Sequence, residues 1–115
     1  MLYYYNMSRT PGDDRIYKAL ADYRRRAILD LLKDSPRTTG EICAHFKRLD
    51  RCTVMQHLRV LEKADLIIVK REGRYRWNYL NVIPIKEIHD RWINPYASRS
   101  VELLARLKQQ IEKPI

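Results

Sequence analysis

The segment from Cys52 to Leu66 constrains the fold of this chain more strongly than any other. A helix turns by about 100° per residue, so Val54, Leu58 and Leu61 fall on one apolar stripe. The opposite stripe carries Cys52, Gln56, Arg59 and Lys63, with Met55 at its edge. The pattern predicts a helix that packs one face into a core and leaves a polar face for a partner. An ordinary solvated face would give the same pattern, so the rest of the chain has to decide.

The charge of the chain indicates the kind of partner. Its 115 residues include 23 Lys and Arg against 14 Asp and Glu, which gives a formal net charge of +9. This balance favours a polyanion, either nucleic acid or an anionic membrane surface, over a protein that is merely basic. The length favours one domain with a small core, to which a partner subunit would add stability.

The chain carries no recognisable signal for export or membrane insertion. It has no run of about 18 apolar residues, and residues 1–8 have neither a basic region nor a long apolar stretch. The cysteines, Cys43 and Cys52, make no disulfide framework. We therefore expect a cytoplasmic protein with free thiols and no membrane partner.

Capping residues predict where the helices begin. The predicted caps are Asp13 or Asp14, Asp22, Thr38 with Glu41 as a capping box, and Asp50. The apolar positions expected in the core of the second and third helices are Ile28, Leu29, Leu31, Leu32, Ile42 and Phe46. Ser35-Pro36 is expected to end the second helix. Residues 1–12 lack periodicity and are expected to form a tail.

Two strands are predicted next, at Leu66–Arg71 and Arg74–Leu80, with Glu72-Gly73 as the turn between them. Asp65 is expected to end the preceding helix in the left-handed conformation. The aromatic side chains that share one face of the second strand are Tyr75, Trp77 and Tyr79. We expect these rings to pack in the core, and stacking on single-stranded bases is the alternative.

The C-terminal segment is predicted to be helical and apolar on one side. A first apolar set, before a break or kink at Pro95, consists of Ile85, Ile88 and Trp92. A second set consists of Leu104, Leu107 and Ile111. Their 3-4 spacing is typical of a helix that packs on another helix.

Four helices, a basic hairpin and a closing helix make a mainly α chain with a small β-hairpin, the winged helix-turn-helix order α-α-α-α-β-β-α. The runs Ile16–Leu32, Thr53–Leu66 and Arg71–Leu80 together resemble the ArsR-type bacterial transcription regulators. The resemblance implies a homodimeric repressor on a palindromic operator, with dimerisation through the first and last helices. We accordingly expect a DNA-binding domain at residues 13–82 and a helical dimerisation segment at residues 83–115.

The chain departs from those relatives that bind metal. The positions that match their Cys-x-Cys pair are Thr38 and Gly40. At the C-terminal metal site of the family, His89 and Asp90 stand without a second histidine. The resemblance therefore implies the metal-independent branch, and we expect neither a metal nor a cofactor.

The residues expected to contact double-stranded DNA lie on the fourth helix and on the hairpin. On the helix they are Arg51, Cys52, Thr53, Met55, Gln56, His57 and Arg59, and on the hairpin they are Lys70, Arg71, Arg74 and Arg76. We expect Gln56 to contact adenine, because an amide can make a bidentate contact to that base, with Arg51 and Arg59 as further candidates for base contacts. The hairpin cations would bind the phosphate backbone or the minor groove of the DNA. Charges on an edge strand also prevent aggregation through that edge, which is a compatible explanation of the same residues.

Two of these residues have an alternative interpretation. His57 fits either a phosphate contact or a packed, half-buried position. Cys52 would lie in the first turn of its helix, where a thiol becomes more acidic, so its oxidation could weaken DNA binding. An inert small residue at a close contact is the simpler interpretation of Cys52.

Dimerisation is expected through apolar residues of the first helix and of the C-terminal segment. These are Ile16, Tyr17, Leu20, Ile88, Trp92, Tyr96, Leu104 and Leu107. No phosphate-binding Gly-rich loop and no nucleophile with a matching base is apparent, so we expect a non-enzyme. The alternatives are a metal- or redox-sensing repressor of the same fold, a winged helix that binds protein, and an RNA-binding protein. The sequence leaves the inducer open.

Overall fold

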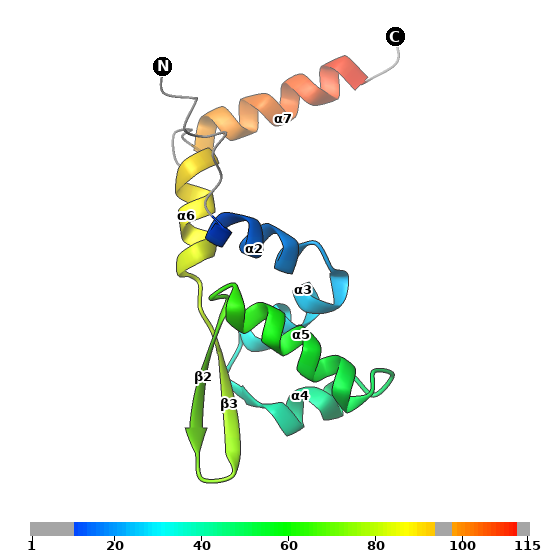
Figure 1. The fold of residues 1–115 in the computed structure, drawn as a ribbon. Coiled ribbons are helices and arrows are strands. Elements are labelled where there is room, and N and C mark those ends of the chain that lie inside the picture. Colours follow the sequence, from blue (N-terminus) through cyan, green and yellow to red (C-terminus); the bar gives the residue numbers. More distant parts are fainter. Residues whose placement is uncertain (1–10, 94–97, 113–115) are drawn as a thin grey trace. The chain divides into compact units, whose positions relative to one another are not determined.

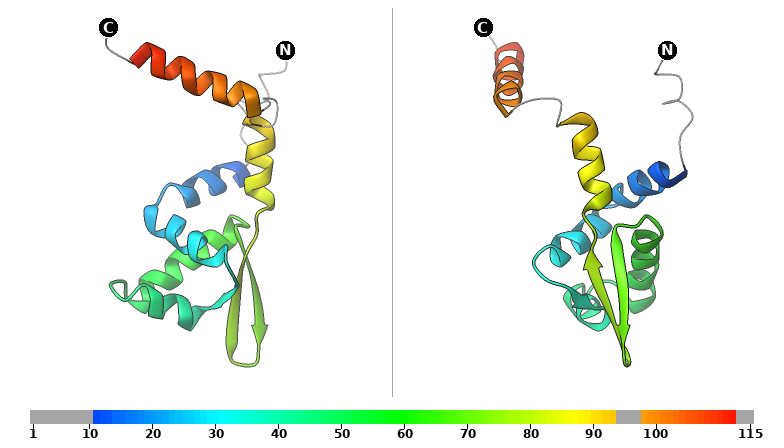
Figure 2. Two further views of the ribbon diagram at one scale, coloured as in Figure 1. Left: turned by 180° about the vertical axis from the view of Figure 1, so that it is seen from behind. Right: turned by 90° about the vertical axis from the view of Figure 1, so that its left-hand side faces the viewer.

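The computed structural model describes the backbone of residues 11–93 and 98–112. Its elements are α2 (Pro11–Leu20), α3 (Tyr23–Leu32), β1 (Arg37–Thr38), α4 (Thr39–His45), α5 (Arg51–Lys63), β2 (Ile67–Glu72), β3 (Tyr75–Leu80), α6 (Ile83–Trp92) and α7 (Ser98–Glu112). The chain divides into two compact units between Pro84 and Ile85. In the first unit the helices gather on one side, and the β2–β3 hairpin extends beyond them (Figure 1, Figure 2).

The predicted winged helix-turn-helix order is confirmed, with two additions. The short strand β1 pairs antiparallel with β3, which makes a three-stranded sheet in the order β1-β3-β2. A two-residue strand shows no alternation in a sequence, which is why it was not predicted. After the hairpin the structure has both α6 and α7 where one closing helix was expected. Pro95, the predicted break, lies outside the described residues.

Local capping groups start three of the helices as predicted. Asp22 and Asp50 accept a backbone N–H in the first turn of α3 and α5, at 2.8 Å and 2.7 Å respectively. Thr38 and Glu41 form the reciprocal capping box of α4. These bonds satisfy N–H groups that a helix start otherwise leaves without partners. The beginnings of α3, α4 and α5 are therefore set within a few residues of sequence.

Two predicted boundaries differ from the structure. Helix α2 begins at Pro11 rather than after an acidic cap, because the fixed φ of proline suits the first turn of a helix. The hairpin turns at Gly73-Arg74, one residue later than predicted. Gly73 takes a φ of 60° at the first position of this turn, as a type II′ turn requires. The left-handed conformation predicted for Asp65 is confirmed by its φ of 59°.

The apolar stripe predicted for α5 lies in the core of the first unit. Val54, Leu58 and Leu61 have no exposed surface. Their buried neighbours from α3, α4 and the start of the hairpin are Ile28, Leu29, Leu32, Ile42, Leu66 and Ile67. Burial of one such side chain is worth about 1.5–3 kcal/mol, so this stripe decides which way α5 faces. The polar stripe of α5 consequently points away from the core.

The expectation that Tyr75, Trp77 and Tyr79 pack in the core is wrong. Tyr75 is 51% exposed, and the other two rings are only partly buried. Successive residues of a strand point to opposite faces, and the inward face of β3 carries the fully buried Asn78 instead. The aromatic rings therefore lie on the outer face of the hairpin, where Trp77 stands opposite Lys70.

His57 joins α5 to α3 through a buried polar contact. Its side chain is 7% exposed, and its Nδ1 lies 3.3 Å from a terminal nitrogen of Arg25. A guanidinium can only donate, so Nδ1 accepts and the imidazole is neutral. The same guanidinium donates to the carbonyls of Ala19 and Lys18 at the end of α2. Burial lowers the pKa of the His57 imidazole below its ordinary value of 6.5.

We predict that the chain loses stability on acidification as His57 takes up a proton. Because the folded-state pKa lies below 6.5, the unfolded chain binds this proton more readily. The contribution of neutral His57 to the free energy of unfolding is complete above pH 6.5. It is lost as the pH falls from 6.5 through the folded-state pKa. Denaturant unfolding at a series of pH values between about 7.5 and about 5.5 measures the slope of the free energy of unfolding against pH.

The variant His57→Gln should flatten this slope, since a glutamine oxygen can accept from Arg25 without titrating. His45→Gln is the control, because His45 is exposed. Equal slopes for the wild type and His57→Gln would contradict the prediction.

Candidate nucleic-acid interface

The polar face of α5 is open to solvent. Its exposed residues are Arg51, Cys52, Gln56 and Arg59, and the partly exposed residues at its flank are Thr53 and Met55. The amide of Gln56 both donates and accepts, which a bidentate contact to the edge of a base requires. This face thus has the exposure and the chemistry for reading a major groove.

His57 is a correction to the predicted set. The structure buries it against Arg25, so its imidazole is not offered to a phosphate. On a helix it lies one position before Leu58, at the edge of the apolar stripe. The packed interpretation of His57 is therefore the one that the structure supports.

The hairpin presents the exposed cations Lys70, Arg71 and Arg74. Lys70 forms an ion pair with Glu72 at 3.1 Å, and the bond to this carboxylate raises the pKa of the Lys70 amine. The guanidinium of Arg74 lies over the ring of Tyr75, 5.5 Å from its centroid. Within the part of the chain that the structure describes, Arg71 and Arg74 have no carboxylate within 4.0 Å. Both keep their full charge for an anionic partner.

Arg76 has a different role from the other predicted hairpin cations. Its side chain is 19% exposed, and one terminal nitrogen donates to Glu62 on α5 at 2.8 Å. The pair ties β3 to α5, and Glu62 offsets the charge that Arg76 was expected to offer to DNA. A partly exposed ion pair of this kind contributes about 1 kcal/mol or less, so it adjusts the position of the hairpin rather than fixing it alone.

Asn78 makes the stronger link, although no sequence pattern predicted a role for it. Its side chain has no exposed surface, and its Nδ2 donates to the Thr39 hydroxyl and to the Arg37 carbonyl, both at 3.2 Å. These bonds join β3 to β1 and to the start of α4. A polar residue between two aromatic positions of a strand was the available signal. The prediction of an inward aromatic face places Asn78 on the outer face of the strand and so hides its role.

The start of α4, the first turns of α5 and the hairpin converge on a hollow of about 420 Å³. Its lining consists of Thr38, Thr39, Gly40, Arg51, Met55, Arg71, Arg74, Tyr75 and Arg76. Four of these nine residues are arginines and none is acidic. Guanidinium groups bind phosphate oxygens through charge-assisted hydrogen bonds, so the hollow suits a polyanion. We call it the arginine hollow.

The predicted dimerisation residues differ in exposure. In the first unit Ile16 and Leu20 are partly buried against the core, and Tyr17 is 37% exposed. In the second unit Ile88 is partly buried, whereas the exposed residues of the set are Trp92, Leu104 and Leu107. Tyr96 lies outside the described residues. Within this set, the apolar side chains that are most exposed to solvent therefore lie on α6 and α7.

The two thiols stand in different surroundings. Cys43 is partly buried and packs against the core, whereas Cys52 is exposed at the start of α5. Over residues 11–93 and 98–112 no group of three or more His, Cys, Asp or Glu side chains is placed to hold a metal ion. None of the described helices is both long enough and apolar enough to cross a membrane.

Comparisons with known proteins agree with this geometry. Residues 15–70 match a family model described as a helix-turn-helix domain. The transcriptional repressor SdpR of Bacillus subtilis (strain 168) is 34% identical over 74 residues, which are 64% of this chain and 81% of SdpR. The uncharacterized HTH-type transcriptional regulator YuzN of the same strain is 37% identical over 86 residues, which are 70% of this chain and 94% of YuzN.

Solved structures agree in fold. A crystal structure of an ArsR family transcriptional regulator is 25% identical with a TM-score of 0.63, and the match covers 93% of this chain and 98% of that one. A solution structure of Mb0332 from Mycobacterium bovis, described as a homodimeric winged helix-turn-helix DNA-binding domain, has a TM-score of 0.60 at 22% identity. That match covers 90% of this chain and 87% of Mb0332.

We predict that Asn78 and Thr39 contribute to stability as a coupled pair. Asn78→Leu keeps a similar volume but leaves the Thr39 hydroxyl and the Arg37 carbonyl without this donor, which should cost about 1–3 kcal/mol. Thr39→Val should lower the free energy of unfolding less in the Asn78→Leu variant than in the wild type, because the bond between the two side chains is already absent there. Urea unfolding of the four proteins of this cycle measures the coupling. Strict additivity of the two substitutions would show that the bond does not hold the hairpin.

Proposed function

We propose a specific role for this chain, which belongs to the ArsR-type winged helix-turn-helix transcriptional regulators: it is a homodimeric repressor of a palindromic operator in double-stranded DNA. The observation that carries the proposal is the arginine hollow beside the exposed face of α5. A groove-reading face and a phosphate-binding surface on one side of a rigid unit are the two parts that specific DNA binding needs.

The proposal divides the interface between base contacts and backbone contacts. Gln56 reads a base in the major groove, and Arg51 and Arg59 stand on the same exposed face. Arg71 and Arg74 hold phosphates, because they are exposed and, among the residues that the structure describes, no carboxylate lies within 4.0 Å of them. Thr53, Met55, Cys52 and Lys70 stand beside these groups as supporting contacts.

The proposed dimer is supported by the exposed apolar surface of the second unit. Helix α7 has 15 residues, and its half-exposed leucines would be left in water in a single chain. An isolated helix of this length is only marginally stable, so it requires a packing partner. A second copy of α6 and α7 is the partner that we propose. The two copies of α5 would then enter successive major grooves, about one helical turn of DNA apart.

Repression is proposed by analogy with the relative SdpR, whose name states that activity. The absence of an obvious nucleophile and base in the sequence is compatible with a protein that acts by binding alone. The metal-independent branch remains part of the proposal, since Thr38 and Gly40 stand where metal-binding relatives carry cysteines.

We predict that Gln56→Ala and Arg74→Ala weaken DNA binding in different ways. A duplex operator is first selected from random sequence, and affinities are then measured by gel shift in a salt series. Gln56→Ala should lose about 1–3 kcal/mol on the operator and little on random DNA, because it removes a base contact. Arg74→Ala should weaken both duplexes alike and lower the salt slope by about one unit per subunit.

Lys33→Gln serves as the charge control, because Lys33 at the end of α3 is exposed and does not line the arginine hollow. Equal losses on specific and random DNA for both variants would contradict the proposed division. Failure of the wild type to bind any duplex would contradict the proposed function itself.

We predict that the double variant Leu104→Gln/Leu107→Gln dissociates the dimer. Both side chains are half exposed in the single chain, so the substitutions leave the first unit intact. Loss of two buried leucines from each copy should raise the dimer dissociation constant by on the order of a hundredfold or more. Sedimentation velocity at micromolar concentration measures it, with Gln109→Ala on α7 as the control. A wild-type chain that sediments as a monomer would refute the dimer.

A further inference from the structure

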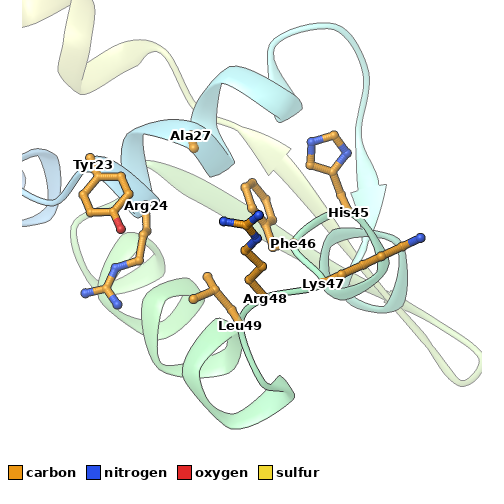
Figure 3. A pocket seen from close by; sticks show the side chains of 8 residues that line it. All are labelled: Tyr23, Arg24, Ala27, His45, Phe46, Lys47, Arg48 and Leu49. Carbon is orange, nitrogen blue, oxygen red and sulfur yellow. The ribbon is translucent and has the colours of Figure 1, made fainter.

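A second hollow lies in the first unit, on the side of α3 and of the turn that joins α4 to α5. Its volume is about 480 Å³, which is within the range of small-molecule sites. Figure 3 shows Tyr23, Arg24 and Ala27 of α3 on one side and the residues of the turn on the other. We call it the turn hollow. It shares no lining residue with the arginine hollow.

The floor and walls of the turn hollow are apolar. Phe46 and Leu49 are partly buried against the core, and Ala27 lies beside them in the lining. Tyr23 is 71% exposed, and the guanidinium of Arg24 lies 5.7 Å from the centroid of its ring. Such surfaces favour a flat apolar body that can stack or pack against rings.

The rim of the turn hollow is cationic. It carries Arg24, Lys47 and Arg48, and no acidic residue lines it. Asp22 holds Arg24 in place through two bonds, at 3.0 Å and 3.2 Å, so the charge of that arginine is largely offset. Lys47 and Arg48 are exposed and, within the described chain, have no carboxylate within 4.0 Å. The uncompensated charge therefore sits on the turn itself.

We propose that the turn hollow binds a small organic anion with a flat apolar body, such as an aromatic carboxylate. The apolar floor with Phe46 takes the ring, and Arg48, whose guanidinium lies toward Phe46 in Figure 3, takes the carboxylate. Lys47, whose side chain is directed away from Arg48 in this view, adds positive charge at the rim. A bare phosphate of a DNA backbone fits less well, because it would leave the apolar floor in water. The hollow matches both the ring and the carboxylate of such a ligand, whereas a general cationic surface would match the carboxylate alone.

The position of the turn hollow makes its ligand a regulator of DNA binding, and this part of the proposal rests on the proposed function. Leu49 donates its N–H to the Phe46 carbonyl at 3.0 Å, and Asp50, the cap of α5, follows directly. A ligand that favours one geometry of this turn shifts the cap Asp50 and the first turn of α5, where Arg51 and Cys52 lie, while the buried stripe keeps the rest of the helix in place. Ligand and DNA then alter each other's affinity by the same factor.

The test uses 1-naphthoate with the full-length chain in isothermal titration calorimetry. We expect one site per chain, with binding of 1-naphthalenemethanol and of acetate at least about tenfold weaker, because each lacks one of the two recognised parts. The variant Lys47→Gln/Arg48→Gln should bind naphthoate about threefold to tenfold more weakly. The control Lys33→Gln/Lys108→Gln, which removes two exposed cations elsewhere, should bind it as the wild type does.

Absence of naphthoate binding at millimolar concentration would overturn the site, and so would equal binding by the two double variants. Phe46→Leu, which keeps an apolar side chain at this position, should weaken naphthoate more than acetate if the ring packs there. Operator affinity measured with and without naphthoate tests the regulatory part. An unchanged affinity overturns that part alone, whereas failure of the ligand-free protein to bind DNA is a failure of the proposed function.

Discussion

The burial of Val54, Leu58 and Leu61 is the constraint on which the interface depends. These side chains leave water together in only one rotational setting of α5, and that setting turns Gln56 and Arg59 outward. Apolar burial is worth about 1.5–3 kcal/mol for each side chain, far more than an exposed polar side chain contributes. The exposed face of α5 is therefore oriented by residues that never touch a ligand.

Polar bonds position the hairpin in the same way that apolar contacts orient α5. Asn78 joins β3 to the start of α4, and the weaker Arg76–Glu62 pair adjusts the position of β3 against α5. A buried amide that lost its partners would pay a full desolvation penalty, so these bonds resist sliding of the hairpin. The arginine hollow exists because both sets of contacts act on one rigid unit. The turn hollow lies on the same unit but shares no lining residue with the arginine hollow.

The candidate site could be foreseen in part. The exposure of Gln56 follows from helical periodicity alone, since it stands opposite the apolar stripe. His57 could not be placed, because its position at the edge of the stripe fits solvent or core equally well. The Nδ1 of this buried side chain is paired with Arg25, which the fold brings to it from 32 residues away. Alternation likewise gave the two faces of β3 but not which face turns inward, and the presence of Asn78 on the inward face depends on Thr39 and β1.

The sequence by itself determined the features whose partners lie within one or two turns of chain. Among these are the caps Asp22 and Asp50, the left-handed Asp65, and the apolar stripe of α5. The tertiary structure alone decided the features that join distant residues, such as the Asn78 bonds across 39 and 41 positions. The physical reason is that helix caps and periodicity act along the chain. Burial and hydrogen bonding between segments exist only after the chain has folded, when each polar group meets a partner that its own neighbours do not supply.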